Sequence, residues 1–178
     1  IFNFDRPTAQ LRGKRWGIIG MGNIGREVAR LAEAFGCEVA YYSTSGVERD
    51  EVYNKLSLNE LLNSSDIISI HCPLNERTHN LIGAEELAMI KNSAILINVA
   101  RGGIVDEAAL AEALNNGNLR GAALDVFTSE PLRESPLYNL KDPYRLLASP
   151  HNAWSSMEAI DQLIACIAGN IQNYASRK

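Results

Sequence analysis

The chain has 178 residues, of which 46% are hydrophobic and 21% charged, a composition that excludes collagen-like, low-complexity and disordered chains. Its 17 Lys and Arg against 21 Asp and Glu give a net charge of −4, so no basic excess favours nucleic-acid binding. No apolar run reaches the roughly 20 residues of a membrane span. The cysteines, Cys37, Cys72 and Cys166, fit no metal-binding spacing, and a reduced, cytoplasmic chain is the simplest interpretation.

Short apolar runs alternate with helical patterns along the chain. After an irregular lead-in at 1–14, the runs that predict strands are 16–19, 39–42, 67–70, 94–97, 122–124 and 146–148. The first predicted helix follows the glycines at 20–25, ends at Gly36, and has an apolar face of Ile24, Val28, Leu31, Ala32 and Phe35. Further helices are predicted from Ser57, over about 84–90, from Asp106 to about 117, and from Ser155 to about 175.

The strand runs are apolar throughout, which is typical of a parallel sheet covered on both faces. Right-handed crossovers then give a doubly wound α/β fold. The segment 127–145 has three prolines and little periodicity, so a loop is expected there. We expect one domain over 15–178 that ends in a C-terminal helix.

A glycine-rich turn follows the first predicted strand and opens a helix. Gly20, Gly22 and Gly25 form G-x-G-x-x-G in the strand–turn–helix context that a dinucleotide site requires. Gly20 permits the tight turn, Gly22 lets a pyrophosphate approach the backbone, and Gly25 lets the helix pack closely on the sheet. A purely structural glycine turn is the alternative interpretation.

The position that distinguishes NAD from NADP is unusual in this chain. NAD-binding members carry an Asp or Glu at the end of the second strand, about 20 residues further on. Here that strand ends in Ser43-Thr44-Ser45, Glu38 lies at its other end, and the nearest arginine is Arg49. A dinucleotide cofactor is therefore expected, with NAD favoured and NADP not excluded.

Motifs at four strand ends resemble the D-isomer-specific 2-hydroxyacid dehydrogenase family over about residues 11–178. They occur in that family's order at 71–74 with Thr78, at 97–103, at 125–131 and at 149–153. The resemblance implies reversible hydride transfer between a nicotinamide and a 2-oxo or D-2-hydroxy acid. It also implies a homodimer formed through the cofactor-binding domains.

The resemblance assigns roles residue by residue. It implies that Arg101 binds the substrate carboxylate, that His151 is the general acid/base, and that Glu130 is its hydrogen-bonded partner. These residue types suit the chemistry, because a guanidinium binds a carboxylate in fixed geometry and imidazole exchanges a proton near neutral pH. The residues implied to contact cofactor are Gly20, Gly22, Asn23, Ile24, Gly25, Ser43, Pro73, Thr78, Val99, Arg101, Asp125 and His151.

Other polar and aromatic residues have blander interpretations. His71 is expected at the rim near the cofactor and Cys72 as a packed residue, while Asp106 most simply caps a helix. Trp154 could close over the nicotinamide or anchor the last helix, and the sequence favours neither.

Family members are close to twice this length and begin with a second α/β domain that supplies half of the substrate pocket. Because the chain begins at Ile1 with only about ten residues before the glycine-rich unit, we expect a fragment that binds dinucleotide but turns substrate over poorly. Two other functions remain open: a dinucleotide-sensing regulator of the corepressor type, and a dehydrogenase for formate or phosphite.

Overall fold

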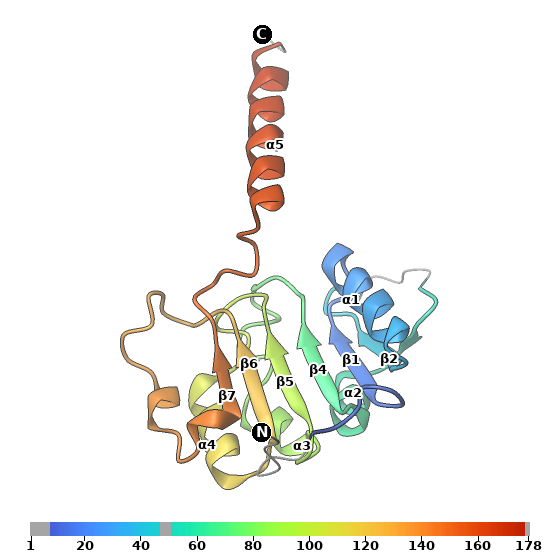
Figure 1. The fold of residues 1–178 in the computed structure, drawn as a ribbon, viewed down its shortest axis with the longest axis vertical. Helices are drawn as coiled ribbons and strands as arrows, with labels where there is room; N and C mark the ends of the chain where they lie inside the picture. Colours follow the sequence, from blue (N-terminus) through green and yellow to red (C-terminus); the bar gives the residue numbers. More distant parts are fainter. Residues whose placement is uncertain (1–7, 47–50, 177–178) are drawn as a thin grey trace, which may run out of the picture.

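The computed structural model describes residues 8–46 and 51–176, which form one parallel seven-stranded sheet with helices around it (Figure 1). The strand order is β3-β2-β1-β4-β5-β6-β7, and every neighbouring pair is parallel. The strands are β1 (Arg15–Ile19), β2 (Glu38–Tyr42), β3 (Asn54–Lys55), β4 (Ile67–Ile70), β5 (Ile95–Asn98), β6 (Gly121–Leu124) and β7 (Leu146–Ala148). The predicted doubly wound, Rossmann-type fold is confirmed.

The helices divide between the two faces of the sheet because β2 and β3 are added on one side of β1 and β4–β7 on the other. With right-handed crossovers, the two directions place their helices on opposite faces. Helix α1 (Asn23–Ala34) packs against β1 and β2 on the near face in Figure 1. On the far face, α2 (Leu58–Ser64), α3 (Ala84–Met89) and α4 (Glu107–Asn116) pack side by side. The main core lies between these three helices and the sheet.

The near face of β4–β7 carries no helix from the described part of the chain (Figure 1). The strand register places Ser69, Ile97, Ala123 and Leu147 in one row across that face. Leu147, on the edge strand, is 71% exposed. The sheet is therefore covered on both sides over β1 and β2 and on one side elsewhere.

The buried face of α1 differs from the predicted one. The residues that pack on the sheet are Gly25, Ala29 and Ala32, whereas Ile24, Leu31 and Phe35 are exposed. A Cβ on Gly25 would collide with the carbonyl oxygen of Gly20, so the helix approaches the sheet too closely for large side chains. Of the predicted face, Ala32 is buried and Val28 packs on the core as expected, whereas the three exposed large residues are too bulky for so close an approach.

Several helix boundaries follow the predicted caps. Ser57 and Glu60 form the capping box of α2, Asp106 accepts from the amides of Ala108 and Ala109 at the start of α4, and Gly36 has a left-handed φ of 81° after α1. The last helix, α5 (Met157–Ala175), was expected to be capped by Ser155, which was wrong. Ser156 caps it by accepting from the amide of Ala159, while Ser155 Oγ donates to the carbonyl of Asn152.

Helix α5 projects from the carboxyl edge of the sheet and packs against no other element (Figure 1). None of its 19 residues is buried, and Leu163, Ile164, Ile167 and Ile171 are at least half exposed. Over residues 8–46 and 51–176, no helix is both long enough and apolar enough to cross a membrane.

Two local features were missed. β3 has only two residues, both exposed, and pairs with β2 at the sheet edge, so it carries no apolar signal. The predicted loop 127–145 contains two 3₁₀ turns, Pro136–Asn139 and Pro143–Arg145, each with proline at its first position and an Ser or Asp side chain capping it.

Candidate active site

The glycine-rich turn between β1 and α1 is packed on one side and open on the other. Gly20 has a φ of 97°, and a Cβ there would lie 2.7 Å from the backbone nitrogen of Cys72. Gly22, in contrast, has nothing within 4 Å of the position its Cβ would occupy. The fold therefore requires glycine at positions 20 and 25. Glycine at position 22 is not required by packing, and it leaves the space in front of the turn open.

A groove of about 760 Å³ runs from this turn across the carboxyl ends of β1, β2 and β4. Its walls are Gly20–Gly22, Ser43–Ser45, His71–Pro73 and Asn75–Arg77. A second hollow of about 510 Å³ shares His71, Cys72 and Pro73 with it and continues to Val99–Arg101, with Ile24 on its rim. Together they form a continuous path from the end of β2 to Arg101, at the edge where ligands of such sheets bind.

Most residues expected to contact cofactor lie along this path: Gly20, Gly22, Ser43, Pro73, Ile24, Val99 and Arg101. Asn23 is exposed at the first position of α1, and Gly25 is buried beneath it. The described residues 43–46 that follow β2 include no carboxylate, and Glu38 at its start pairs with Arg15 at 3.2 Å. Arg49 falls outside the described residues.

Thr78 does not face this path. It is fully buried, its Oγ1 donates to the carbonyl of Pro73 at 2.6 Å, and the same oxygen accepts from the amide of Asn75 at 2.8 Å. The hydroxyl thus makes both of these hydrogen bonds within its own loop. Thr78 therefore acts through the shape of the groove wall, and its contact with a cofactor stays a prediction.

A buried polar chain lies beneath the groove floor. The indole nitrogen of Trp16 donates to Ser69 Oγ at 2.8 Å, and Ser69 Oγ lies 3.0 Å from His71 Nε2. Burial lowers the pKa of His71 to about 4, so its ring is neutral at pH 7. Burial also raises the pKa of the Cys72 thiol to about 11, which keeps it protonated and agrees with a packing role.

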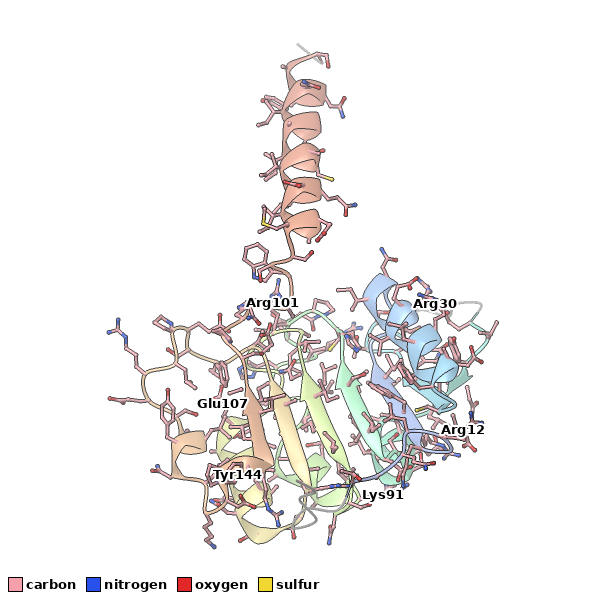
Figure 2. The ribbon with its side chains drawn as sticks, in the orientation of Figure 1. Arg12, Arg30, Lys91, Arg101, Glu107 and Tyr144 are labelled. Atoms are coloured by element: carbon pink, nitrogen blue, oxygen red, sulfur yellow. The ribbon has the colours of Figure 1, made fainter. Side chains whose placement is uncertain are left out.

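Arg101 stands on a turn after β5, at the carboxyl edge of the sheet (Figure 2). The side chain of the buried Asn98 closes the turn: its Oδ1 accepts from the amide of Ala100 at 3.0 Å, and its Nδ2 donates to the carbonyl of Arg101 at 2.9 Å. A Cβ on Gly102 would collide with the carbonyl of Phe127. The Arg101 turn is therefore wedged against the loop that carries Glu130.

Glu130 and His151 are brought together from segments 21 residues apart. Glu130 Oε2 lies 2.6 Å from His151 Nδ1, and its other oxygen accepts from the amide of Phe127 at 2.9 Å. The hydrogen bond with His151, followed by that amide, holds the pKa of Glu130 below its usual value. With Nδ1 bound to a carboxylate, His151 keeps Nε2 for a ligand, and about a third of each side chain is exposed.

Asp125 anchors the loop that carries His151. It accepts from Ser149 Oγ and from the amides of Asn152 (3.0 Å) and Ala153 (2.9 Å). Burial opposes ionisation of this carboxyl, but the three hydrogen bonds outweigh it and hold its pKa below the usual value. Asp125 was expected to face the nicotinamide; here both oxygens are turned to the His151 loop and the residue is buried.

Two contributions were missed by sequence reasoning. Glu107, in the first turn of α4, accepts from the amide of Thr128 at 2.7 Å and from Ser135 Oγ at 3.0 Å, and so ties the Glu130 loop to a helix (Figure 2). Ser149 supports Asp125. An acid at a helix start is ordinarily explained by the helix dipole, and a lone serine before a proline gives no signal.

Trp154 follows the His151 loop and is 55% exposed. Its indole nitrogen donates to the carbonyl of His151 at 2.9 Å. The structure thus shows neither of the two placements that the sequence allowed. Instead, Trp154 holds the backbone of His151, which has a left-handed φ of 53°.

A family model described as the NAD binding domain of D-isomer specific 2-hydroxyacid dehydrogenases matches residues 3–153. The chain belongs to this family. Its match to the NAD-binding domain agrees with the glycine-rich turn and with the groove that begins there.

Relatives in this family are similar over nearly the whole chain. A glycerate dehydrogenase of Methylorubrum extorquens is 39% identical over 175 residues, 98% of this chain and 54% of that protein. A D-lactate dehydrogenase of Aquifex aeolicus, solved with NAD and lactic acid, is 29% identical with a TM-score of 0.88 over 98% of this chain and 58% of its own. An acyclic imino acid reductase (Bsp5), solved with NADPH and D-Arg, is 34% identical with a TM-score of 0.86 over 96% of this chain and 53% of its own.

The chain thus spans about half the length of the family members it matches. The half that it spans contains the glycine-rich turn, the Arg101 turn and the Glu130–His151 pair.

Proposed function

We propose that this chain, with residues 15–178 as its folded unit, is the cofactor-binding half of a dehydrogenase that interconverts small 2-oxo acids and D-2-hydroxy acids. The observation that carries the proposal is the Glu130–His151 pair, 2.6 Å apart at the carboxyl edge of the sheet on which the groove from the glycine turn leads to Arg101. A proton donor and a carboxylate-binding guanidinium at the end of a dinucleotide groove suit reduction of a carbonyl next to a carboxylate.

The residues of the groove fit a nicotinamide dinucleotide. Open space in front of Gly22 and the amino end of α1 suit the pyrophosphate, and the two adjoining hollows suit two nucleosides. The bound nicotinamide would supply or accept the hydride. Val99 and Ile24 would exclude water beside it, since both line the hollow that ends at Arg101.

The chain's own residues would bind the acid and move the proton. Arg101, exposed and held by its turn, would bind the substrate carboxylate. His151 would give the proton on Nε2 to the carbonyl oxygen, and Glu130, bonded to Nδ1, would fix the orientation of the ring. Asp125 would hold the loop in register through its three hydrogen bonds.

The test compares the full-length parent protein with this chain. The parent should oxidise NADH or NADPH in the presence of glyoxylate, hydroxypyruvate or pyruvate, whereas this chain should bind the dinucleotide by calorimetry with little or no turnover. Turnover of formate or phosphite alone would identify the other type of dehydrogenase. Tight dinucleotide binding with no turnover of any acid by the parent would favour a sensing regulator. A robust reductase rate from this chain alone would contradict the proposal that it is only the cofactor-binding half.

We propose further that the parent acts in the cytoplasm as a homodimer. Cys37, Cys72 and Cys166 are free thiols, as in a reducing compartment. The bare near face of β4–β7 and the exposed apolar residues of α1 and α5 are surfaces that an assembly would bury. Light scattering of the full-length protein should give twice the monomer mass, and a monomeric mass at micromolar concentration would contradict this.

A further inference from the structure

The segment that carries Glu130 buries few side chains of its own. Phe127 is buried in the main core and Leu132 packs against that core, but residues 128–131 between them are exposed. A segment with so little buried surface keeps one geometry only where other contacts hold its backbone. Glu130 must nevertheless be placed closely enough to meet His151 Nδ1 at 2.6 Å. The geometry of this pair therefore depends on what restrains the segment.

Glu107, the first residue of α4, binds the segment at two points (Figure 2). Its Oε1 accepts from the amide of Thr128 at 2.7 Å, and its Oε2 accepts from Ser135 Oγ at 3.0 Å. Ser135 Oγ in turn accepts from the amide of Leu137 and so caps the 3₁₀ turn that follows. The two oxygens of one carboxylate thus hold both ends of the exposed segment.

Helix α4 does not need the side chain of Glu107 for its own cap. Asp106 caps the helix by accepting from the amides of Ala108 and Ala109. The helix is a firm base for the segment, because Leu110 on its inner face is fully buried in the main core. A charge that only favoured the helix dipole could point into solvent, whereas both oxygens of Glu107 are turned to the segment after β6.

The peptide group that joins Phe127 to Thr128 is held on both of its sides. Its N–H donates to Glu107, and its carbonyl lies against Gly102, where a Cβ would collide with it. Only two soft dihedral angles separate this peptide group from the amide of Phe127, which donates to Glu130 Oε1 at 2.9 Å. Glu107 therefore acts on the Glu130 carboxylate through a single residue of backbone.

We propose that Glu107 is a positioning residue for proton transfer, which keeps Glu130 on His151 Nδ1 and so selects the tautomer of the imidazole. This inference rests on the proposed function and adds a residue of α4 to the same site. An ionised carboxylate only accepts hydrogen bonds, so Glu130 holds the ring proton on Nδ1 and leaves Nε2 to exchange a proton with the substrate. Without Glu107, the segment moves, and the ring loses both its orientation and its single tautomer.

The site of the proton on the neutral His151 ring tests this in the present chain without any turnover. Nitrogen NMR distinguishes a proton on Nδ1 from one on Nε2, and the unmodified chain should hold it mainly on Nδ1. Glu107→Ala should give a mixture of the two tautomers. Glu107→Gln, which keeps an oxygen for the amide of Thr128, should restore most of the Nδ1–H form. Glu112→Ala, an exposed acid on the same helix, should behave like the unmodified chain.

The full-length parent supplies the kinetic counterpart. Glu107→Ala should lower kcat by about 10- to 100-fold, because the proton donor is misplaced, while the affinity for dinucleotide stays unchanged. Glu107→Gln should recover most of the lost kcat. A fall in dinucleotide affinity equal to the fall in kcat would contradict an action through Glu130.

A purely structural role gives a different result. If Glu107→Ala lowers the unfolding temperature but His151 keeps its Nδ1–H form, Glu107 only stabilises the fold and the inference is overturned. Should Glu107→Ala not fold, Ser135→Ala removes one of the two contacts and must shift the tautomer in the same direction, and no shift overturns the inference. If the tautomer responds but the parent turns over no acid, the proposed function fails while the placement of Glu130 by Glu107 stands.

Discussion

The two ends of the groove differ in how far residues of this chain enclose them. At the β1–β2 end the sheet is covered on both faces, and the groove has two walls from this chain, Ser43–Ser45 and Asn75–Arg77. At the β5–β7 end the near face of the sheet is bare, and the hollow lined by Arg101 includes neither Glu130 nor His151. The β1–β2 end of the groove is therefore enclosed by residues of this chain, whereas the β5–β7 end is open on its near face.

The largest expected effect separates chemistry from binding. In the full-length protein, His151→Gln should lower kcat by about 100- to 10,000-fold, because glutamine cannot donate the proton. The affinity for dinucleotide should change little, since the groove walls are distant in the chain from His151. Stopped-flow turnover and calorimetry measure the two quantities. If cofactor affinity falls in parallel with kcat, then His151 holds the site together and the two ends are not independent.

The floor of the groove should give a pH-dependent stability. His71 has a pKa of about 4 in the fold against 6.5 when unfolded, so the unfolded chain binds more protons between these values. The contribution of His71 to the free energy of unfolding should be fully present above pH 6.5, and the free energy should fall by about 3 kcal/mol as the pH drops to 4. Urea titrations across this range measure it.

Replacement of the ring supplies the control for that measurement. His71→Gln removes the titrating group, so its stability should depend less on pH over the same range. A variant that retains the full dependence would place its origin in other groups, such as the depressed carboxyls of Asp125 and Glu130, whose contribution is lost as the pH falls through their folded pKa values.

Two glycines of one turn should respond in opposite ways. Gly22→Ala has open space, so stability should stay within about 0.5 kcal/mol while dinucleotide affinity falls at least about tenfold, because the methyl group occupies the approach of the pyrophosphate. Gly25→Ala should destabilise the fold by about 1–3 kcal/mol, because its methyl group meets the carbonyl of Gly20. Thermal unfolding and calorimetry distinguish them, and unchanged affinity in Gly22→Ala would place the phosphates elsewhere.

A smaller effect is expected at the other end. Glu107→Ala should cost about 1–2 kcal/mol and loosen the loop 127–135, because Thr128 and Ser135 lose their acceptor. Limited proteolysis should then cut within that loop, while Glu112→Ala, an exposed acid on the same helix, should not promote cleavage. If both variants resist the protease equally, Phe127 against Gly102 and the Glu130 contact hold the loop without Glu107.

The sequence predicted what depends on local pattern. Six strands, the glycine-rich turn and the caps at Ser57 and Asp106 follow from periodicity and from residue types with specific backbone roles. The predicted buried face of α1 was wrong at Ile24, Leu31 and Phe35, because the distance between helix and sheet is a tertiary property that the sequence pattern does not show. β3 was missed because two exposed residues carry no hydrophobic signal.

The site was predictable to the level of which residues gather at the sheet edge. Glu130 and His151 meet as expected. Thr78 and Asp125 turn inward, because a buried hydroxyl or carboxylate must satisfy its hydrogen bonds. An amide of its own loop supplies one to Thr78, and two amides of the His151 loop supply them to Asp125. Glu107 was missed because its partners lie 21 and 28 residues ahead in a segment without periodicity.

The two tryptophans of the chain lie beside two different parts of the candidate site. Trp16 is linked through Ser69 to His71 on the groove floor, and Trp154 is bonded to the carbonyl of His151. A Trp154→Phe protein would emit tryptophan fluorescence only from the neighbourhood of His71, and a Trp16→Phe protein only from the neighbourhood of His151. The molecule thus carries one natural optical label for each half of its site, and the order in which the halves respond to a ligand is open to direct observation.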